Sequence, residues 1–328
     1  MIVTRAPLRI SYAGGGTDYP SYFNNNEGNI VGTTFNQFTY CYINELSPIS
    51  REKIRFNYRI TESVEKIDDL LHPVLRETLK LLGNQTRLNI GTFSDIPSGT
   101  GLGGSSSFAV ALISGLSLQF KMSLTLNEIA KLAIKVEREL LREDGGWQDQ
   151  LHATFGGLRH YKFSEKKFNV SEELIANHHL PYLSDRHLLV WSGSTREARK
   201  YSAVTNAAIK NENRVLADAS RLADQLTKSL KSAESARDVY QFLSNAVEEG
   251  WEYKKEFSAP PSESVKDIIR VLKNHGVHSF KLLGAGHEGF VLCLAEPEVL
   301  QAIVKHIGKS RCIKPKLIST GVEVLINV

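Results

Sequence analysis

The chain has 328 residues, of which 41% are hydrophobic and 23% are charged, with 40 basic residues against 36 acidic ones. This composition predicts a globular protein large enough for two domains with separate cores. The near balance of charge argues against nucleic acid as a partner, and no apolar run approaches the roughly 18 residues that a membrane span needs. The cysteines, Cys41, Cys293 and Cys312, lack metal or disulfide spacing, and no signal-peptide pattern occurs, so we expect a cytoplasmic protein.

The first half of the chain mixes strand and helix patterns. Strands are expected at 2–12, 29–46, 53–60, 86–94 and 157–163. Apolar residues at helical spacing predict helices at 67–83, 105–120, 126–142 and 147–155. A polar, irregular stretch near 165–190 then indicates a domain boundary, so we assign 1–180 and 181–328 to two domains.

The second half begins with a buried-strand pattern at 187–192, and amphipathic helical stretches follow from 196 to 257. The remainder predicts helices at 263–275 and 297–307 and strands at 277–283, 289–295, 311–318 and 321–327. Strands and helices in this order predict an α+β fold with a ferredoxin-like layer in the second domain.

The most informative segment is 96–108, with the sequence IPSGTGLGGSSSF. A proline, then glycines and serines, run directly into an apolar helix, which makes a flexible linker a poor alternative. Free backbone N–H groups at such a helix start suit a phosphate. We therefore expect nucleotide phosphates at Pro97, Gly99, Gly101, Gly103, Gly104, Ser105 and Ser106.

This loop differs from two common phosphate-binding loops. No lysine lies between Pro97 and Phe120, which excludes a Walker loop. The acidic residue expected about 20 residues after a dinucleotide-binding glycine loop is also missing. The loop therefore needs a charge partner from elsewhere, and we expect a divalent ion held by a carboxylate.

Three motifs in register resemble those of the small-molecule kinases named for galactose, homoserine, mevalonate and phosphomevalonate, the GHMP kinases. They are RAPLRISYAGGGTD at 5–18, PSGTGLGGSS at 97–106 and KLLGAGHEGF at 281–290. The resemblance spans nearly the whole chain. It implies an N-terminal α+β domain and a ferredoxin-like C-terminal domain, with ATP, Mg²⁺ and a small-molecule substrate in the cleft between them.

The resemblance places Ser105 on the metal and the phosphates, although Gly104 stands where the family usually has a first serine, and Ser106 where it usually has alanine. It also places Glu137 on the metal. The alternative is that Glu137 is a charge on a solvated helix face, and Glu139 is then the second candidate. Mg²⁺ prefers such oxygen ligands.

Asp149 lies seven residues before Gly156 and Gly157, the family's spacing for the residue that accepts or orients the proton of the attacking hydroxyl. The alternative is that Asp149 caps the short helix at 147–155. Arg9 matches a family cation beside this aspartate and would keep it ionised. Otherwise Arg9 is a charge on the surface of a strand.

The family brings polar groups to the substrate at the turn that contains Gly16, Thr17 and Asp18, and Asp18 would bind sugar hydroxyls. The alternative is that Asp18 only stabilises its own turn. The resemblance also puts Gly284 and Gly286 beside the reacting groups, whereas His287 and Glu288 replace family glycines and are expected at the rim.

A cluster of Arg196, Arg199 and Lys200 follows the strand at 187–192 and either binds a phosphate already on the substrate or forms an exposed helix turn. Within the family, the first motif and Gln-Asp-Gln at 148–150 look most like kinases of heptose 7-phosphate that act on the anomeric hydroxyl. A fucokinase-like enzyme and a non-catalytic nucleotide sensor stay open as alternatives. The sequence leaves the sugar, the anomer, the adenine contacts and the choice between monomer and homodimer undetermined.

Overall fold

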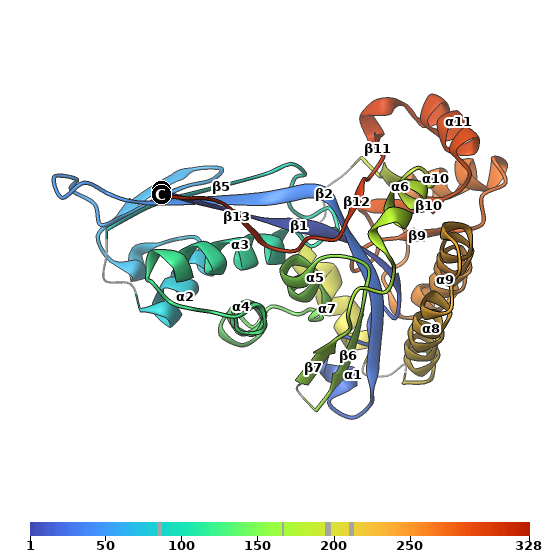
Figure 1. Ribbon diagram of the computed structural model, residues 1–328, viewed down its shortest axis with the longest axis horizontal. Helices are drawn as coiled ribbons and strands as arrows, with labels where there is room; N and C mark the ends of the chain where they lie inside the picture. The colour runs from blue at the N-terminus through green and yellow to red at the C-terminus, as the bar shows by residue number, and fades with distance from the viewer. Residues whose placement is uncertain (84–86, 166, 194–197, 210–212) are drawn as a thin grey trace.

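Figure 1 shows a computed structural model of the chain, which describes residues 1–83, 87–165, 167–193, 198–209 and 213–328. Its strands form two sheets flanked by helices, which confirms the predicted α+β class. Among these residues, no helix is both long and apolar enough to cross a membrane.

The first sheet follows the long axis of the molecule (Figure 1). Its central strand, β2, is long enough to pair with β1 along most of its length, with β5 at one end and with β6 at the other. The path runs β13-β1-β2-β5-β3-β4, and β6, β7 and β12 attach beside it. The strands are β1 (Ile2–Ala13), β2 (Gly28–Glu45), β3 (Ile54–Asn57), β4 (Thr61–Val64), β5 (Leu88–Ser94), β6 (Arg159–Ser164), β7 (Lys167–Val170), β12 (Leu317–Ile318) and β13 (Glu323–Asn327).

One helix, α3 (Gly104–Gln119), lies at the centre of the first domain. It is apolar on all sides and packs against the sheet and against α2 (Pro73–Leu82), α4 (Leu126–Ile134) and α5 (Gln148–Phe155). The helix predicted at 126–142 is regular only as far as Ile134, and a π-helical segment, Lys135–Leu140, continues it.

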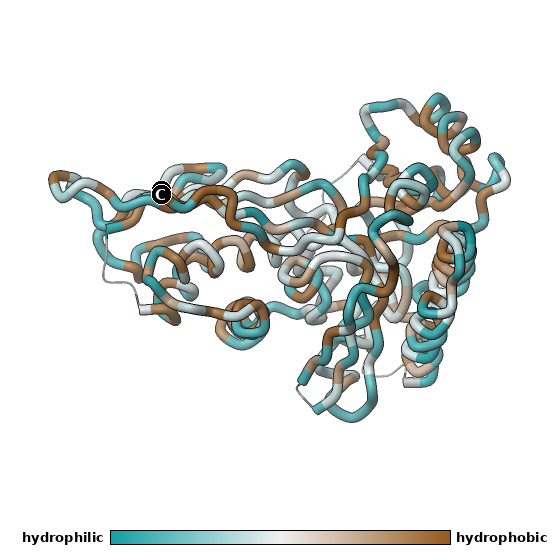
Figure 2. Tube along the Cα trace, viewed as in Figure 1, coloured by the Kyte–Doolittle hydropathy of each residue, from teal (hydrophilic) through white to brown (hydrophobic). Residues whose placement is uncertain are grey.

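The second sheet is antiparallel, in the order β11-β8-β10-β9. The long amphipathic helices of this half carry both hydrophobic and hydrophilic residues along each turn (Figure 2). The elements here are β8 (His187–Trp191), β9 (Phe280–Leu282), β10 (Phe290–Leu294), β11 (Cys312–Ile313), α7 (Ala198–Ile209), α8 (Asn213–Lys231), α9 (Ala236–Phe257), α10 (Glu263–Asn274) and α11 (Pro297–Ile307). Shorter pieces are α1 (Pro20–Phe23), α6 (Leu180–Ser184) and the 3₁₀ turns Ile67–Asp69, Asn177–His179 and Lys309–Arg311.

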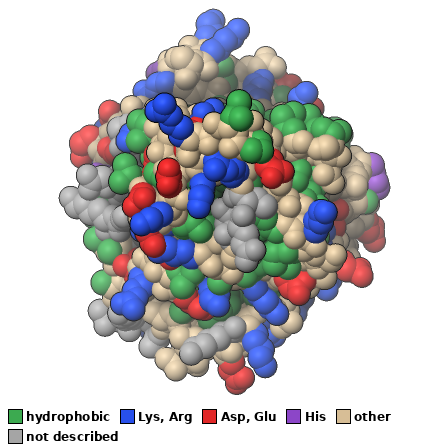
Figure 3. All heavy atoms as spheres, turned by 90° about the vertical axis from the view of Figure 1, so that its left-hand side faces the viewer, with side chains coloured by type: hydrophobic (Ala, Val, Ile, Leu, Met, Phe, Trp, Pro, Cys, Tyr) green, Lys and Arg blue, Asp and Glu red, His purple; other side chains and the backbone are tan. Residues whose placement is uncertain are grey.

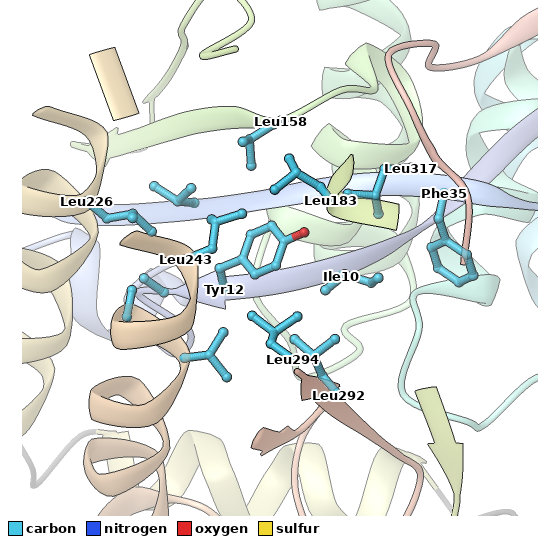
Figure 4. Packing of buried hydrophobic residues seen from close by; sticks show 14 of the residues in the cluster. Ile10, Tyr12, Phe35, Leu158, Leu183, Leu226, Leu243, Leu292, Leu294 and Leu317 are labelled. Atoms are coloured by element: carbon cyan, nitrogen blue, oxygen red, sulfur yellow. The ribbon is translucent and has the colours of Figure 1, made fainter. Parts of the chain in front are cut away.

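Each half has a hydrophobic core of its own, as expected, and a further buried cluster joins the two halves. Tyr12 from β1, Leu243 from α9 and Leu292 from β10 belong to the same buried cluster (Figure 4). Within it, the hydroxyl of Tyr12 lies 2.8 Å from Nε2 of His187, and so links the two sheets. The two halves are therefore joined by a packed interface.

The C-terminal end of the chain returns from the second half to the first sheet. β12 pairs with β2, and β13 pairs with β1 with Ile2 opposite Asn327. The segment from β12 onward therefore lies in the first sheet, although the sequence places it with the second domain. The end of the molecule that contains this sheet's outer strands presents hydrophobic side chains among interspersed basic and acidic ones (Figure 3).

Candidate active site

A cleft lies where the two halves meet. One wall comes from the first half and contains the start of α3, the turn after β1 and the start of α5. The other comes from the second half: Thr205 of α7, the end of α9 and the segment from Lys281 to Ala285. The cleft brings together twelve of the predicted site residues: Arg9, Gly16, Asp18, Gly99, Gly101, Gly103, Gly104, Ser105, Ser106, Glu137, Asp149 and Gly284.

The glycine-serine loop ends in a helix start that faces this cleft. Gly103 is the N-cap of α3 and has a left-handed φ of 83°, which favours glycine. A Cβ there would lie 3.4 Å from side-chain carbons of Arg9 and Asp149, so the loop backbone packs closely against both residues. The first N–H groups of a helix have no partner within the helix, and these can bind an anion.

Glu137 is buried, so the alternative of a solvated helix face is wrong. Its carboxylate accepts hydrogen bonds from the hydroxyls of Ser105 and Ser106, at 3.0 and 2.7 Å, and from Nε2 of Gln150 at 2.5 Å. Glu137 lies in the π-helical segment, an irregularity that often marks functional sites. Glu139, the second candidate, is exposed and does not line the cleft.

These oxygen ligands fit Mg²⁺, which typically binds one or two carboxylates together with phosphates and water. In the part of the chain that the structure describes, no group of three or more His, Cys, Asp or Glu side chains could hold a metal. An ion beside Glu137 and Ser105 would therefore take its other ligands from a bound nucleotide and from water.

Arg9 and Asp149 form an ion pair at the cleft. Nε of Arg9 lies 2.7 Å from Oδ1 of Asp149, and another guanidinium nitrogen donates to the carbonyl of Gly101 at 2.6 Å. Arg9 is buried, so it is not a strand-surface charge. Burial alone would raise the pKa of Asp149, but Arg9 and, more weakly, Arg138 outweigh it and hold that pKa below its ordinary value.

Asp149 does not cap α5. It is the second residue of that helix, the N-cap position belongs to Trp147, and no side chain caps the helix. Asp149 therefore presents an ionised carboxylate to the cleft, with Oδ1 held by Arg9. Among the described residues, none donates a hydrogen bond to Oδ2 of Asp149.

Asp18 is fully buried at the cleft wall. Its two carboxylate oxygens accept the backbone N–H groups of Gly16 and Gln148, at 3.2 and 3.1 Å. Burial raises its pKa, and these hydrogen bonds oppose the rise. Gly146 is required here, because a Cβ would lie 1.8 Å from Asp18. Asp18 thus stabilises its own turn and also faces the cleft.

Several predicted residues lie away from the cleft. Thr17 is buried behind the turn, and its hydroxyl lies within hydrogen-bond distance of the carbonyl oxygens of Gly14 and Asn29. Pro97 and Gly286 do not line the cleft, and His287 packs on the Tyr201 ring with a centroid distance of 4.5 Å. Arg196 lies outside the described residues, and the side chains of Arg199 and Lys200 are not described either.

The prediction missed two buried lysines on the second wall. Nζ of Lys254 donates to the carbonyl oxygens of Leu282, at 2.7 Å, and of Gly284. Nζ of Lys281 donates to the carbonyl oxygen of Tyr12 at 3.2 Å. Burial and the nearby Arg9 lower the pKa of Lys281 to about 8, against the attraction of Asp18. Lys281 could have been noticed in the sequence as a lysine within an apolar strand pattern. Lys254 could not, because it lies in an ordinary amphipathic helix.

An anion-binding helix start, a carboxylate with hydroxyls for a metal, and an ionised aspartate paired with arginine are the groups that phosphoryl transfer to a hydroxyl requires. The arrangement defines a kinase of small molecules. Residues 69–157 match the N-terminal domain of GHMP kinases. The D-glycero-alpha-D-manno-heptose 7-phosphate kinase of Campylobacter jejuni is 30% identical over 94% of this chain and 94% of its own length.

The chain therefore belongs to the GHMP kinase family, whose members use ATP to phosphorylate small molecules. The bifunctional fucokinase/GDP-fucose pyrophosphorylase of Arabidopsis thaliana is also 30% identical, over 65% of this chain and 20% of its own length. A D-glycero-D-manno-heptose 1-phosphate kinase from Bacteroides thetaiotaomicron has the same fold, with a TM-score of 0.80, 22% identity and full coverage of both chains. The galactokinase of Lactococcus lactis, solved with galactose, gives a TM-score of 0.74 at 14% identity over 98% of this chain and 94% of its own.

Proposed function

We propose that the protein transfers a phosphoryl group from ATP to the anomeric hydroxyl of D-glycero-D-manno-heptose 7-phosphate, giving the 1,7-bisphosphate. The ion pair of Arg9 with Asp149, beside the helix start that suits phosphates, carries the proposal that the acceptor is a hydroxyl. The Campylobacter jejuni relative, similar along nearly its whole length, supports the choice of sugar.

In this proposal the start of α3 holds the nucleotide phosphates, because its unpaired N–H groups point to the cleft. Glu137 and Ser105 hold Mg²⁺, which neutralises phosphate charge when bound. The buried hydrogen bonds from Ser106 and Gln150 fix the Glu137 carboxylate in place beforehand.

Asp149 orients the attacking hydroxyl and accepts its proton as the new bond from oxygen to phosphorus forms and the bond to the leaving diphosphate breaks. Its lowered pKa keeps it ionised at neutral pH, so it is ready to accept a hydrogen bond. Arg9 holds Oδ1, which leaves Oδ2 for the substrate. The positive charge of Arg9 also stabilises the transferring phosphoryl group.

A fucokinase-like activity is the second candidate, since the fucokinase relative is as similar to this chain over a shorter stretch. Both candidates share the anomeric hydroxyl as acceptor, but only one acceptor carries a phosphate. We propose that the substrate phosphate is bound near Arg196, Arg199 and Lys200, and the test must therefore compare phosphorylated and free sugars.

The deciding experiment measures ADP release with Mg²⁺ and ATP across heptose 7-phosphate, free heptose, fucose, galactose and mannose, and identifies the product by phosphorus NMR. Heptose 7-phosphate should react far faster than free heptose, because a bound phosphate positions the sugar. A product phosphorylated at the anomeric carbon is expected. Equal rates on free and phosphorylated heptose, or preference for fucose, would reject the proposed substrate, and no turnover with any sugar would favour a nucleotide sensor.

A further inference from the structure

Lys281 is a buried cation whose hydrogen bonds are only partly satisfied. It comes from β9, is 3% exposed, and lines the cleft. An ammonium has three N–H donors, yet the carbonyl of Tyr12 is the one acceptor found for it among the described residues. Burying a charge without full pairing is unfavourable, so a group that enters the cleft and accepts the other N–H bonds would relieve that cost.

Asp18 has the complementary capacity on the first wall. Each of its oxygens accepts one backbone N–H, and a carboxylate has about four lone-pair sites, so further donors can be accepted. Its turn lies close to Lys281, because a Cβ on Gly15 would be 4.0 Å from Nζ. A donor from the second half and an acceptor from the first half therefore lie near each other in one cleft.

The mixed charge of this pair selects the ligand chemistry. A phosphate group would gain from Lys281 but would be repelled by the Asp18 carboxylate. A sugar hydroxyl both donates and accepts, so two neighbouring hydroxyls can satisfy both side chains at once. The pair suits a neutral diol better than an anion.

We propose that Lys281 is a specificity-determining residue that donates a hydrogen bond to one sugar hydroxyl while Asp18 accepts from its neighbour. This inference rests on the proposed function, because it assigns a sugar to the same cleft. It adds a contact from the second half of the chain, so that the sugar is held by both walls.

The test compares Lys281→Met with the wild type, using heptose 7-phosphate and its monodeoxy analogues as acceptors. Losing a hydrogen bond from a charged donor should raise KM for the sugar about 10- to 100-fold. Binding of a fluorescent ATP analogue should be unchanged. With the wild type, one deoxy analogue should show the same rise in KM that Lys281→Met shows with the full sugar. With Lys281→Met, that analogue should show no further rise in KM, because both changes remove the same contact.

Two further variants separate binding from structure. Lys281→Gln keeps a donor for the Tyr12 carbonyl, so it should fold normally and still raise KM for the sugar. Lys266→Met is the matched control, since Lys266 is an exposed lysine on α10 that pairs with Glu263, and it should change nothing.

Three results would overturn the inference alone. The first is an unchanged KM for the sugar in a folded Lys281→Met, and the second is an equal loss of affinity for nucleotide and sugar in that variant. The third is that the rises in KM caused by the variant and by the deoxy analogue add up for every analogue. If the wild type phosphorylates no sugar, the proposed function fails first and this inference fails with it. If the wild type phosphorylates a sugar and Lys281→Met does so equally well, only the inference fails.

Discussion

The two walls of the cleft are built differently. On the first wall side chains bond to one another: Arg9 to Asp149, and Ser105 and Ser106 to Glu137. On the second wall Lys254 and Lys281 bond to backbone carbonyl oxygens. Side chains that are already paired with one another are held in one geometry, which suits chemistry common to many substrates.

The carbonyl oxygen that accepts from Lys281 has no full negative charge, so this hydrogen bond does not neutralise the ammonium. We therefore expect Arg9, Asp149 and Glu137 to act in phosphoryl transfer, and Lys281 to bind the acceptor together with Asp18. Variants of Asp149 should lower kcat, whereas variants of Lys281 should raise KM for the sugar.

The largest effect is expected from Asp149→Asn. Loss of the group that accepts the proton should lower kcat roughly 10²- to 10⁴-fold. Nucleotide affinity should be preserved, because the helix start is untouched. Steady-state ADP release and titration with a fluorescent ATP analogue measure both quantities.

Asp267→Asn is the control, as Asp267 is an exposed carboxylate paired with Arg270 on α10. A near-normal kcat in Asp149→Asn would remove the first wall from the chemistry and end the proposed contrast between the walls.

The next effect concerns the metal. Glu137→Gln should raise the Mg²⁺ concentration needed for half-maximal activity about 10-fold or more, since the carboxylate charge is lost while the shape stays. Rates measured over a range of Mg²⁺ concentrations test this. Glu139→Gln, an exposed neighbour two residues away, is the matched control. If Glu139→Gln shifted the Mg²⁺ dependence and Glu137→Gln did not, the metal assignment would move to Glu139.

The first wall could largely be predicted from the sequence, because its elements are contiguous motifs. The glycine-serine loop, the Gly-Gly-Gly-Thr-Asp turn and the Gln-Asp-Gln segment can each be recognised from a few consecutive residues. Gly83, predicted to end α2, does so as a left-handed C-cap with a φ of 75°. Regular periodicity likewise predicted most strands and helices.

On the second wall Gly284 was predicted from its motif, but the contacts of the two lysines were not, because they join distant residues. The bond from Lys281 to Tyr12 spans 269 positions, and nothing in either segment signals it. The return of β13 to the first sheet and the buried cluster around Tyr12 have the same cause. The π-helical turn at Glu137 was missed because its apolar spacing still resembles an α-helix.

A smaller effect, on KM for the sugar, is expected when pH rises. The pKa of Lys281 is about 8, so its ammonium is mostly charged at pH 7 and mostly neutral at pH 9. The groups that act on it are Arg9, which disfavours its charge, and Asp18, which favours it. If Lys281 donates to the sugar, KM for the sugar should rise up to about 10-fold between pH 7 and pH 9.

Lys281→Met should lack this rise, while the pH dependence of nucleotide binding should match that of the wild type. KM profiles for both substrates, in both proteins, decide the point. The same rise in the variant would assign the titration to another group and would weaken the case for a selective second wall.

The last expected effect is on the interface that joins the two walls. His187 is buried between the sheets, where its Nε2 contacts the Tyr12 hydroxyl and its Nδ1 contacts the carbonyl oxygen of Leu183. Burial lowers the pKa of His187 to about 4, so the folded protein keeps this ring neutral. An unfolded histidine has a pKa near 6.5, so the stabilisation is fully present above about pH 6.5 and is lost as pH falls toward 4.

The loss should reach about 3 kcal/mol of unfolding free energy at pH 4, from roughly 1.4 kcal/mol for each pH unit. Denaturant titrations between pH 7 and pH 4 measure it. His187→Gln cannot be protonated, so it should be less stable at pH 7 but should lose less stability on acidification. His152 is also buried, with a pKa lowered to about 3, and it contributes to the acid sensitivity that remains in the variant. If the wild type and His187→Gln lost stability in parallel, the link between the sheets would not depend on a neutral His187.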